Sequence, residues 1–88
     1  MDFLHTDLPG VSAGTRVRVD IDTESNVRLM DDNNFQRFQR NERHEYFGGH
    51  YKNSPVILEV PRYGNWHITI DIGGGSATIR SNVTVLTV

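Results

Sequence analysis

Residues 54–71 have the sequence SPVILEVPRYGNWHITID, and this stretch decides the fold. Apolar residues recur at every second position in both of its halves: Val56, Leu58 and Val60, then Trp66, Ile68 and Ile70. A period of two is typical of a β-strand that buries one face. Between the halves, Pro61 fixes its own φ and Gly64 can take a positive φ, which predicts a tight turn. We therefore expect a strand, a turn and a second strand that together form a hairpin.

Three further strands are predicted nearer the N-terminus. Phe3–Leu8 is a short strand that ends at Pro9-Gly10, because Pro cannot donate a hydrogen bond to a neighbouring strand. Thr15–Asp22 alternates clearly and turns three apolar side chains toward the core: Val17, Val19 and Ile21. After a polar turn, Val27–Leu29 resumes the alternation, with Met30 on the outer side. We expect these last two segments to form an antiparallel hairpin.

The alternating strand pattern ends in the middle of the chain. Asp31-Asp32-Asn33-Asn34 interrupts the strand pattern, and such side chains can cap a helix because they accept bonds from backbone N–H groups. Phe35 and Phe38 are spaced as i and i+3, which predicts one or two helical turns anchored on a sheet by the two rings. His44–Phe47 fits another short strand. Gly48-Gly49 then predicts a bulge, a sharp bend or a turn.

The C-terminal part predicts one more turn and one more strand. Gly73-Gly74-Gly75 is the turn, and the sequence alternates again from Ser76 to Val85. Seven or eight short strands, with turn signals about every 8–12 residues, indicate an antiparallel sandwich or a small barrel. We expect an all-β fold: an antiparallel β-sandwich, jelly-roll-like, with one short helical segment. The 88 residues form a single domain.

Composition and charge exclude several classes of protein. The net charge of −2 argues against a nucleic-acid binder or a membrane-surface binder, since both usually need a basic field. The absence of cysteine excludes disulfides and thiolate chemistry. The N-terminus lacks the basic and apolar regions of a signal peptide, and no apolar run approaches the roughly 20 residues of a membrane span. We expect a cytoplasmic protein.

Several separated motifs resemble one known family. They are Met1–His5, Asn26–Asp31 followed by Asn34-Phe35, Tyr46–Gly49, Ser54–Val56, Gly64–Trp66 and Asp71–Gly74. Together they resemble the bacterial family of domains of unknown function numbered 1883, over nearly the whole chain. The resemblance implies an all-β domain that occurs alone or joined to Toll/interleukin-receptor-type domains. It implies no known activity, and so no catalytic residue is carried over.

Histidines are the residues that could hold a metal ion in a chain without cysteine. The chain has four of them: His5, His44, His50 and His67. No two have the i, i+4 spacing of a helical metal motif, and no His-x-His pair occurs. We therefore expect scattered surface or network histidines, no metal site and no cofactor.

His67, Thr69 and Asp71 share the strand face opposite Trp66. A histidine and an aspartate four residues apart on a strand are roughly 13 Å apart, too far for a catalytic triad. We expect a solvated polar face with no catalytic residue. The run Gly73–Gly75 lacks the Lys-Ser/Thr of a phosphate-binding loop, so a hairpin turn is the preferred interpretation there.

The region from Phe35 to Tyr51 is the predicted binding surface. Its candidate residues are Arg37, Arg40, Arg43, Tyr46, Phe47, Gly48, Gly49, His50 and Tyr51, with Tyr63 as a further exposed aromatic. Arginine clusters bind anionic groups, and Arg and Tyr are enriched at interface hot spots. The alternative interpretations are a solvated helix face offset by Glu42 and Glu45, and ordinary bulge geometry at the two glycines.

Three classes of function follow, in order of preference. The first is a non-enzymatic binding or sensor module for a protein or a small anionic ligand. The second is a structural protein that forms homo-oligomers through a sheet edge or face. An enzyme comes last, because the chain shows no cysteine, no carboxylate pair with a base and no nucleophile motif.

Overall fold

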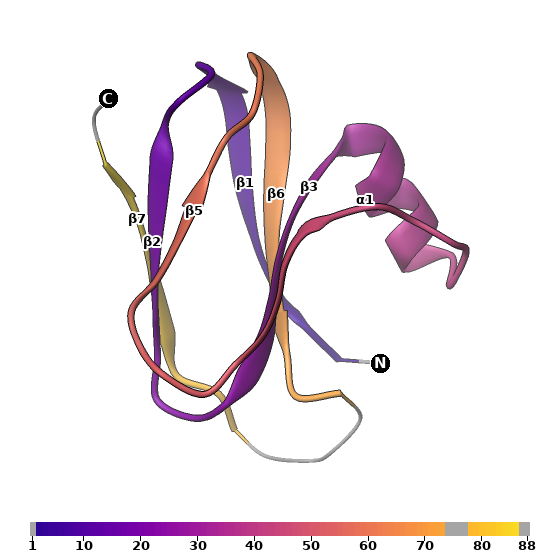
Figure 1. Ribbon diagram of the computed structural model, residues 1–88. Helices are drawn as coiled ribbons and strands as arrows, with labels where there is room; N and C mark the ends of the chain where they lie inside the picture. Colours follow the sequence, from indigo (N-terminus) through magenta and orange to yellow (C-terminus); the bar gives the residue numbers. More distant parts are fainter. Residues whose placement is uncertain (1, 74–77, 87–88) are drawn as a thin grey trace.

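The computed structural model describes residues 2–73 and 78–86, which form seven strands and one helix (Figure 1). The strands are β1 (Leu4–Val11), β2 (Arg16–Ile21), β3 (Ser25–Asp31), β4 (Phe47–Tyr51), β5 (Val56–Glu59), β6 (Gly64–Asp71) and β7 (Ser81–Leu86). The helix α1 (Asp32–Gln39) follows β3 directly. No helix in this described part of the chain is long and apolar enough to cross a membrane.

The strands form two antiparallel sheets that pack face to face. The four-stranded sheet has the order β1-β6-β3-β4, and the three-stranded sheet has the order β5-β2-β7. This arrangement confirms the predicted all-β sandwich with one short helix. It does not confirm a jelly roll, which has eight strands where the described residues form seven.

Both predicted hairpins are wrong in their pairing. β5 and β6 lie in different sheets, and so do β2 and β3. The connection from β5 to β6 crosses from one sheet to the other, so their apolar faces meet across the core instead of lying side by side. Gly64 begins β6 and is absent from the described residues with positive φ, which corrects the predicted turn.

The core lies between the sheets, as the alternation predicts. All six alternating apolar residues of the opening stretch are buried in one cluster with Val17 and Val19 of β2. The stretch therefore decides the fold through the side chains that it buries. Trp66 packs there with a relative exposure of 2%, and its Nε1–H donates to the backbone oxygen of Arg62 at 3.0 Å.

The largest differences between predicted and observed strand boundaries are in β1, β4 and β7. β1 continues past Pro9-Gly10 to Val11 with a shift of register, which an edge strand tolerates because one of its sides needs no donor. β4 begins at Phe47 and not at His44, and it contains Gly48 and Gly49 as paired strand residues. β7 begins at Ser81; Gly74–Ala77, where a turn and a strand start are expected, lie outside the described residues.

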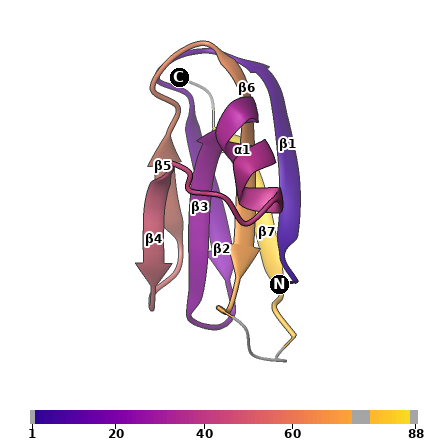
Figure 2. The ribbon, with the colours of Figure 1, turned by 90° about the vertical axis from the view of Figure 1, so that its right-hand side faces the viewer.

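Helix α1 forms a third layer over the outer face of the four-stranded sheet (Figure 2). Asp31 caps the helix as predicted, since its Oδ1 accepts from the backbone N–H of Asn34 at 3.0 Å. Phe35 and Phe38 are buried against Met30 and Phe3, which confirms the predicted anchoring by two rings. This layer covers the part of the sheet that carries the polar side chains described next.

Candidate functional site

The outer face of β6 is polar but buried, which corrects the expectation of a solvated face. His67, Thr69 and Asp71 have relative exposures of 8%, 0% and 0%. Phe35 of α1 covers His67, and Arg28 of β3 pairs with Asp71. Alternation places these side chains away from the core, but a period of two cannot show that a helix lies above them.

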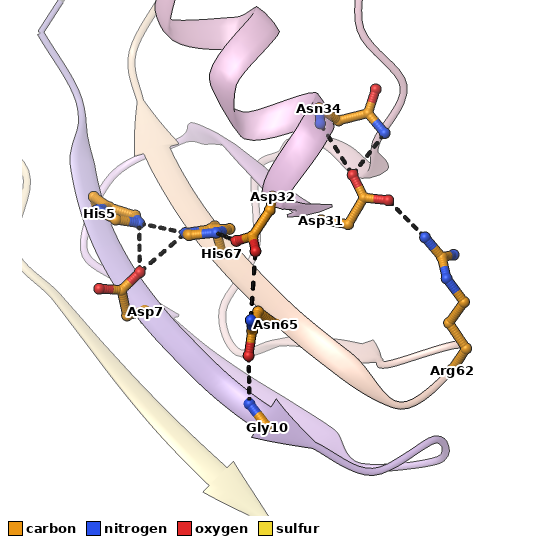
Figure 3. Close-up of polar contacts among 9 residues, drawn as sticks. All are labelled: His5, Asp7, Gly10, Asp31, Asp32, Asn34, Arg62, Asn65 and His67. Atoms are coloured by element: carbon orange, nitrogen blue, oxygen red, sulfur yellow. Dashed lines mark hydrogen bonds and ion pairs between the residues drawn. The ribbon is translucent and has the colours of Figure 1, made fainter.

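Two histidines and one aspartate meet on this face (Figure 3). His5 and Asp7 are two residues apart on β1, and Asp7 is the antiparallel partner of His67 on β6. His5 Nε2 lies 2.9 Å from His67 Nδ1, and Asp7 Oδ1 lies 3.0 Å from His67 Nδ1 and 3.4 Å from His5 Nε2. Of the expected surface or network histidines, His5 and His67 are therefore network histidines, and they lie together instead of scattered.

The other nitrogen of His67 faces a second carboxylate. His67 Nε2 lies 2.5 Å from Asp32 Oδ1 in the first turn of α1, and the amide of Asn65 donates to Asp32 Oδ2 at 3.4 Å. The hydrogen bond from His67 lowers the pKa of Asp32, so this carboxylate is an acceptor. Asn65 is itself held by the backbone N–H of Gly10 at 2.9 Å, as Figure 3 shows.

Phe35 fixes both imidazole rings. Its ring is stacked on His5 and on His67, with 4.3 Å between centroids in each pair. Burial lowers the pKa of His5, and the neighbouring His67 lowers it further, while Asp7 acts in the opposite direction. The side chain of His67 is 10% exposed, whereas that of Asp7 is 68% exposed, so the cluster opens to solvent on the Asp7 side.

Asp31, next in the chain to Asp32, closes the N-terminus of α1. Its second oxygen accepts from Arg62 at 2.6 Å. Partial burial alone raises the pKa of Asp31, but the hydrogen bonds from Asn34 and the charge of Arg62 outweigh that effect and lower it. A shallow cleft of about 180 Å³ lies beside this contact, between the start of α1 and the β5–β6 connection.

Arg28 and Asp71 form a second polar group on the same face. Their side chains make a 2.5 Å ion pair, with exposures of 17% and 0%. Asn26 and the backbone N–H of Gly73 also donate to Asp71, and the Arg28 guanidinium lies over the rings of Phe38 and Tyr46. This pair ties β3, β6 and the segment after α1 together, which is a structural role, although the buried Arg28 Nε has no hydrogen-bond partner among the described residues.

A family model for a domain of unknown function, DUF1883, matches residues 1–88, which is the whole chain. The chain belongs to the DUF1883 family. No curated protein and no solved structure matches it significantly. The family description names no activity.

The structure of this DUF1883 domain places the three predicted arginines on one exposed segment. Arg37 and Arg40 lie on and just after the last turn of α1, and Arg43 follows in the connection to β4. None of the three makes an ion pair with another residue of the described chain, whereas Arg18, Arg28 and Arg62 do. These arginines remain predicted binding residues.

The other predicted binding residues of this DUF1883 domain are spread over different surfaces. Tyr46 lies over Arg28 with 44% of its surface exposed, and Phe47 is 50% exposed. His50 is held on the opposite side of β4 from Phe47 by Glu24 and Asn26. The rest lie elsewhere: Gly48 and Gly49 within β4, Tyr51 packed on the core, and Tyr63, 72% exposed, in the β5–β6 connection.

Gly48 has a structural explanation in the DUF1883 domain. Its φ is +114°, and a Cβ atom at this position would lie 2.2 Å from the backbone oxygen of Val27. Close approach of β4 to β3 therefore requires glycine here. Of the predicted surface, Arg37, Arg40, Arg43, Tyr46 and Phe47 are all exposed and close in sequence within residues 37–47, although Phe38 in this segment is buried.

The sequence does contain a signal for the histidine cluster. His5-Thr6-Asp7 is a His-x-Asp pair, and two residues apart on a strand put both side chains on one face. It is not a His-x-His pair, because its second ligand is a carboxylate. The meeting with His67 depends on the pairing of β1 with β6, a contact between residues 62 positions apart that no local pattern predicts.

Proposed function

We propose that this DUF1883 domain is a non-enzymatic binding module that recognises an acidic segment of a partner protein. The recognition surface is the segment of residues 37–47, with Arg37, Arg40 and Arg43 as its charged groups. The observation that carries the proposal is that one stretch of the chain holds three exposed arginines without a carboxylate partner among the described residues, and ends at the half-exposed Tyr46 and Phe47.

The chemistry of these side chains favours an acidic protein segment. Each guanidinium presents planar donors that match a carboxylate in a bidentate way, and Tyr46 and Phe47 add apolar contact area beside them. The net charge of −2 makes the arginine segment a local exception on an acidic protein. A local positive patch selects an acidic partner while the rest of the surface repels one.

A fluorescein-labelled peptide of alternating Glu and Tyr residues provides the test, with fluorescence anisotropy at low salt as the readout. We expect saturable binding to the full chain that weakens as salt rises. The triple variant Arg37→Ala, Arg40→Ala and Arg43→Ala should bind at least about tenfold more weakly, because charged hot-spot residues each contribute on the order of 1 kcal/mol or more.

A matched triple variant controls for net charge. Arg16, Lys52 and Arg80 are also exposed and make no ion pair in the described chain, and they lie outside residues 37–47. Replacing these three with Ala changes the net charge by the same amount and should leave affinity nearly unchanged. Equal weakening in both triple variants, or no saturable binding to the wild type, would refute the proposal.

Self-assembly is a second candidate, favoured by the open side of the sandwich. β4 and β5 are edge strands in the described chain and face each other across a groove of about 510 Å³. Phe47 and Ile57 line this groove and are each about half exposed. A second copy that pairs through β4 would satisfy the free strand edge and cover both side chains.

Native mass spectrometry tests this second candidate. A dimer that Ile57→Lys converts to a monomer, while Val85→Lys leaves it intact, is the expected result. Val85 is the matched control because it is equally exposed but lies on β7, at the far edge of the three-stranded sheet. A monomeric wild type at micromolar concentration removes the candidate.

A further inference from the structure

Three potential ligand atoms converge on one point of the four-stranded sheet. Nε2 of His5, Nδ1 of His67 and Oδ1 of Asp7 form a triangle with sides of 2.9, 3.0 and 3.4 Å. We propose that His5, Asp7 and His67 bind a divalent transition-metal ion. This proposal replaces the expectation drawn from the sequence that the chain has no metal site.

The size of the triangle fits coordination of one ion. Imidazole nitrogens and carboxylate oxygens lie about 2.0–2.2 Å from a bound zinc ion. Two ligands at about 2.1 Å from an ion are separated by about 3.0 Å when they subtend a right angle, and by about 3.4 Å at the tetrahedral angle. The three sides therefore match ligands on one face of a coordination sphere without movement of either strand.

Counting protons supports an ion at this point. His67 Nε2 donates its hydrogen to Asp32, so in the neutral ring Nδ1 carries a lone pair. This nitrogen then faces the Asp7 carboxylate, another acceptor, at 3.0 Å. With His67 in this neutral tautomer, a cation at the centre of the triangle can accept a lone pair from all three atoms, whereas a hydrogen from His5 Nε2 would be shared between two acceptors.

The surroundings of the triangle resemble those of a metal ligand. Metal-binding histidines usually donate their second ring N–H to a carboxylate, which fixes the tautomer and the orientation of the ring. Asp32 takes this position for His67, and Asn65 holds Asp32 in turn. Phe35 stacks on both imidazoles, so neither ring can turn away without losing that contact.

The ligand set indicates the kind of ion. Two imidazoles and one carboxylate suit zinc, nickel, copper or ferrous iron better than calcium or magnesium, which prefer oxygen ligands. Asp7 is 68% exposed, so the remaining coordination positions face solvent and can hold water. The site lies apart from the segment of residues 37–47, and its test does not depend on the acidic-peptide experiment.

Isothermal titration calorimetry of zinc chloride into the metal-free full chain tests the proposal. We expect saturable binding near one equivalent for the wild type. His5→Gln and Asp7→Asn should each lower the zinc affinity more than about tenfold, and Asp32→Asn should lower it by about 10–100-fold through loss of the supporting carboxylate. Circular dichroism establishes that each variant is folded before titration.

His50→Gln is the matched control, because His50 also contacts a carboxylate, that of Glu24 at 2.9 Å, but lies on β4. This variant should bind zinc as the wild type does. Long-range ¹H–¹⁵N spectra should show zinc-dependent shifts at Nε2 of His5 and Nδ1 of His67. The proposal is overturned by no saturable binding, by an unchanged affinity in His5→Gln or Asp7→Asn, or by equal weakening in His50→Gln.

Discussion

The outer faces of the two sheets have similar sequence patterns and different environments. On β2, Arg16 and Arg18 alternate with buried valines and are exposed, as a surface strand predicts. On β6, His67 and Asp71 alternate with buried apolar residues in the same way, yet both are buried. The difference is the helical layer of α1 and the segment after it, which cover only the four-stranded sheet.

This comparison shows what a polar strand face can mean. An exposed polar side chain is solvated and needs no particular partner, whereas a buried one is usually paired. On the covered face Thr69 is an exception, since its hydroxyl has no partner among the described residues. The covered face therefore holds the connected groups of the molecule, the His5–Asp7–His67–Asp32 cluster and the Arg28–Asp71 pair. The uncovered face holds one surface pair, Arg18 with Asp20.

The largest expected effect tests the core, which lies between the inner faces of the two sheets. Trp66→Ala should lower the free energy of unfolding by about 3–5 kcal/mol, because it leaves a large cavity among buried side chains. Denaturant unfolding followed by circular dichroism measures the change. Ile57→Ala, at an apolar position that is 48% exposed, should cost far less. A Trp66→Ala protein as stable as Ile57→Ala would contradict the buried position of the ring.

The next prediction compares the two ion pairs directly. Arg28→Ala leaves the fully buried Asp71 without its cation and should cost about 3 kcal/mol, whereas Arg18→Ala should cost less than about 1 kcal/mol. Chemical denaturation of both variants measures the two losses. Similar values for the two arginines would show that the helical layer does not exclude water from Arg28.

The third prediction concerns the strand beside Arg28. Gly48→Ala should destabilise the protein by more than about 1 kcal/mol, because its Cβ would overlap the Val27 oxygen at a positive φ. Gly64→Ala should change stability by less than about 0.5 kcal/mol, since the nearest atom to its Cβ, Trp66 Nε1, lies at an ordinary 3.5 Å. Equal melting temperatures for the two variants would place β4 further from β3 than the structure does.

The smallest expected effect is at the start of the helical layer. Asp31→Ala removes the cap of α1 and should cost about 1 kcal/mol at neutral pH. The pKa of Asp31 is lowered in the folded protein, so its contribution is complete above the ordinary value of 3.8 and is lost as the pH falls through the folded value. The stability difference between wild type and variant should therefore shrink below pH 3.8. Thermal melts at several pH values measure it.

A second variant separates the cap from the charge. Asp31→Asn keeps an oxygen that can accept from Asn34 but loses the ion pair with Arg62. It should be more stable than Asp31→Ala, with a weaker dependence on pH than the wild type. A constant difference between wild type and both variants across the acid range would show that Asp31 has an unperturbed pKa.

Sequence patterns predicted the buried faces well and the pairing of strands poorly. Val17, Val19, Ile68 and the two helix phenylalanines lie where their spacing placed them, because one buried face requires a regular period. Which strand lies next to which is decided by contacts across the core. For this reason β5 and β6, adjacent in the chain, were wrongly expected to pair.

Such sequence patterns could not predict the candidate metal site, for the same reason. His5 and Asp7 can be placed on one face from their spacing, but their meeting with His67 depends on β1 lying beside β6, and the stacking of His5 and His67 depends on Phe35 of α1. The exposure of the three arginines, in contrast, can be predicted from the local sequence alone, since a polar helix face requires no distant partner.

The alternation of strands between the sheets has a consequence for folding kinetics. Among the strands of the described residues, only β3 and β4 are consecutive in the chain and lie in one sheet, and the pairing of β1 with β6 joins Leu4 to Ile70. Few contacts can form before large loops close. The chain therefore loses the conformational entropy of these loops before the strand contacts that stabilise the sheets are made. We therefore expect folding on the millisecond-to-second timescale of non-local β-proteins, with a transition state that already contains both ends of the chain.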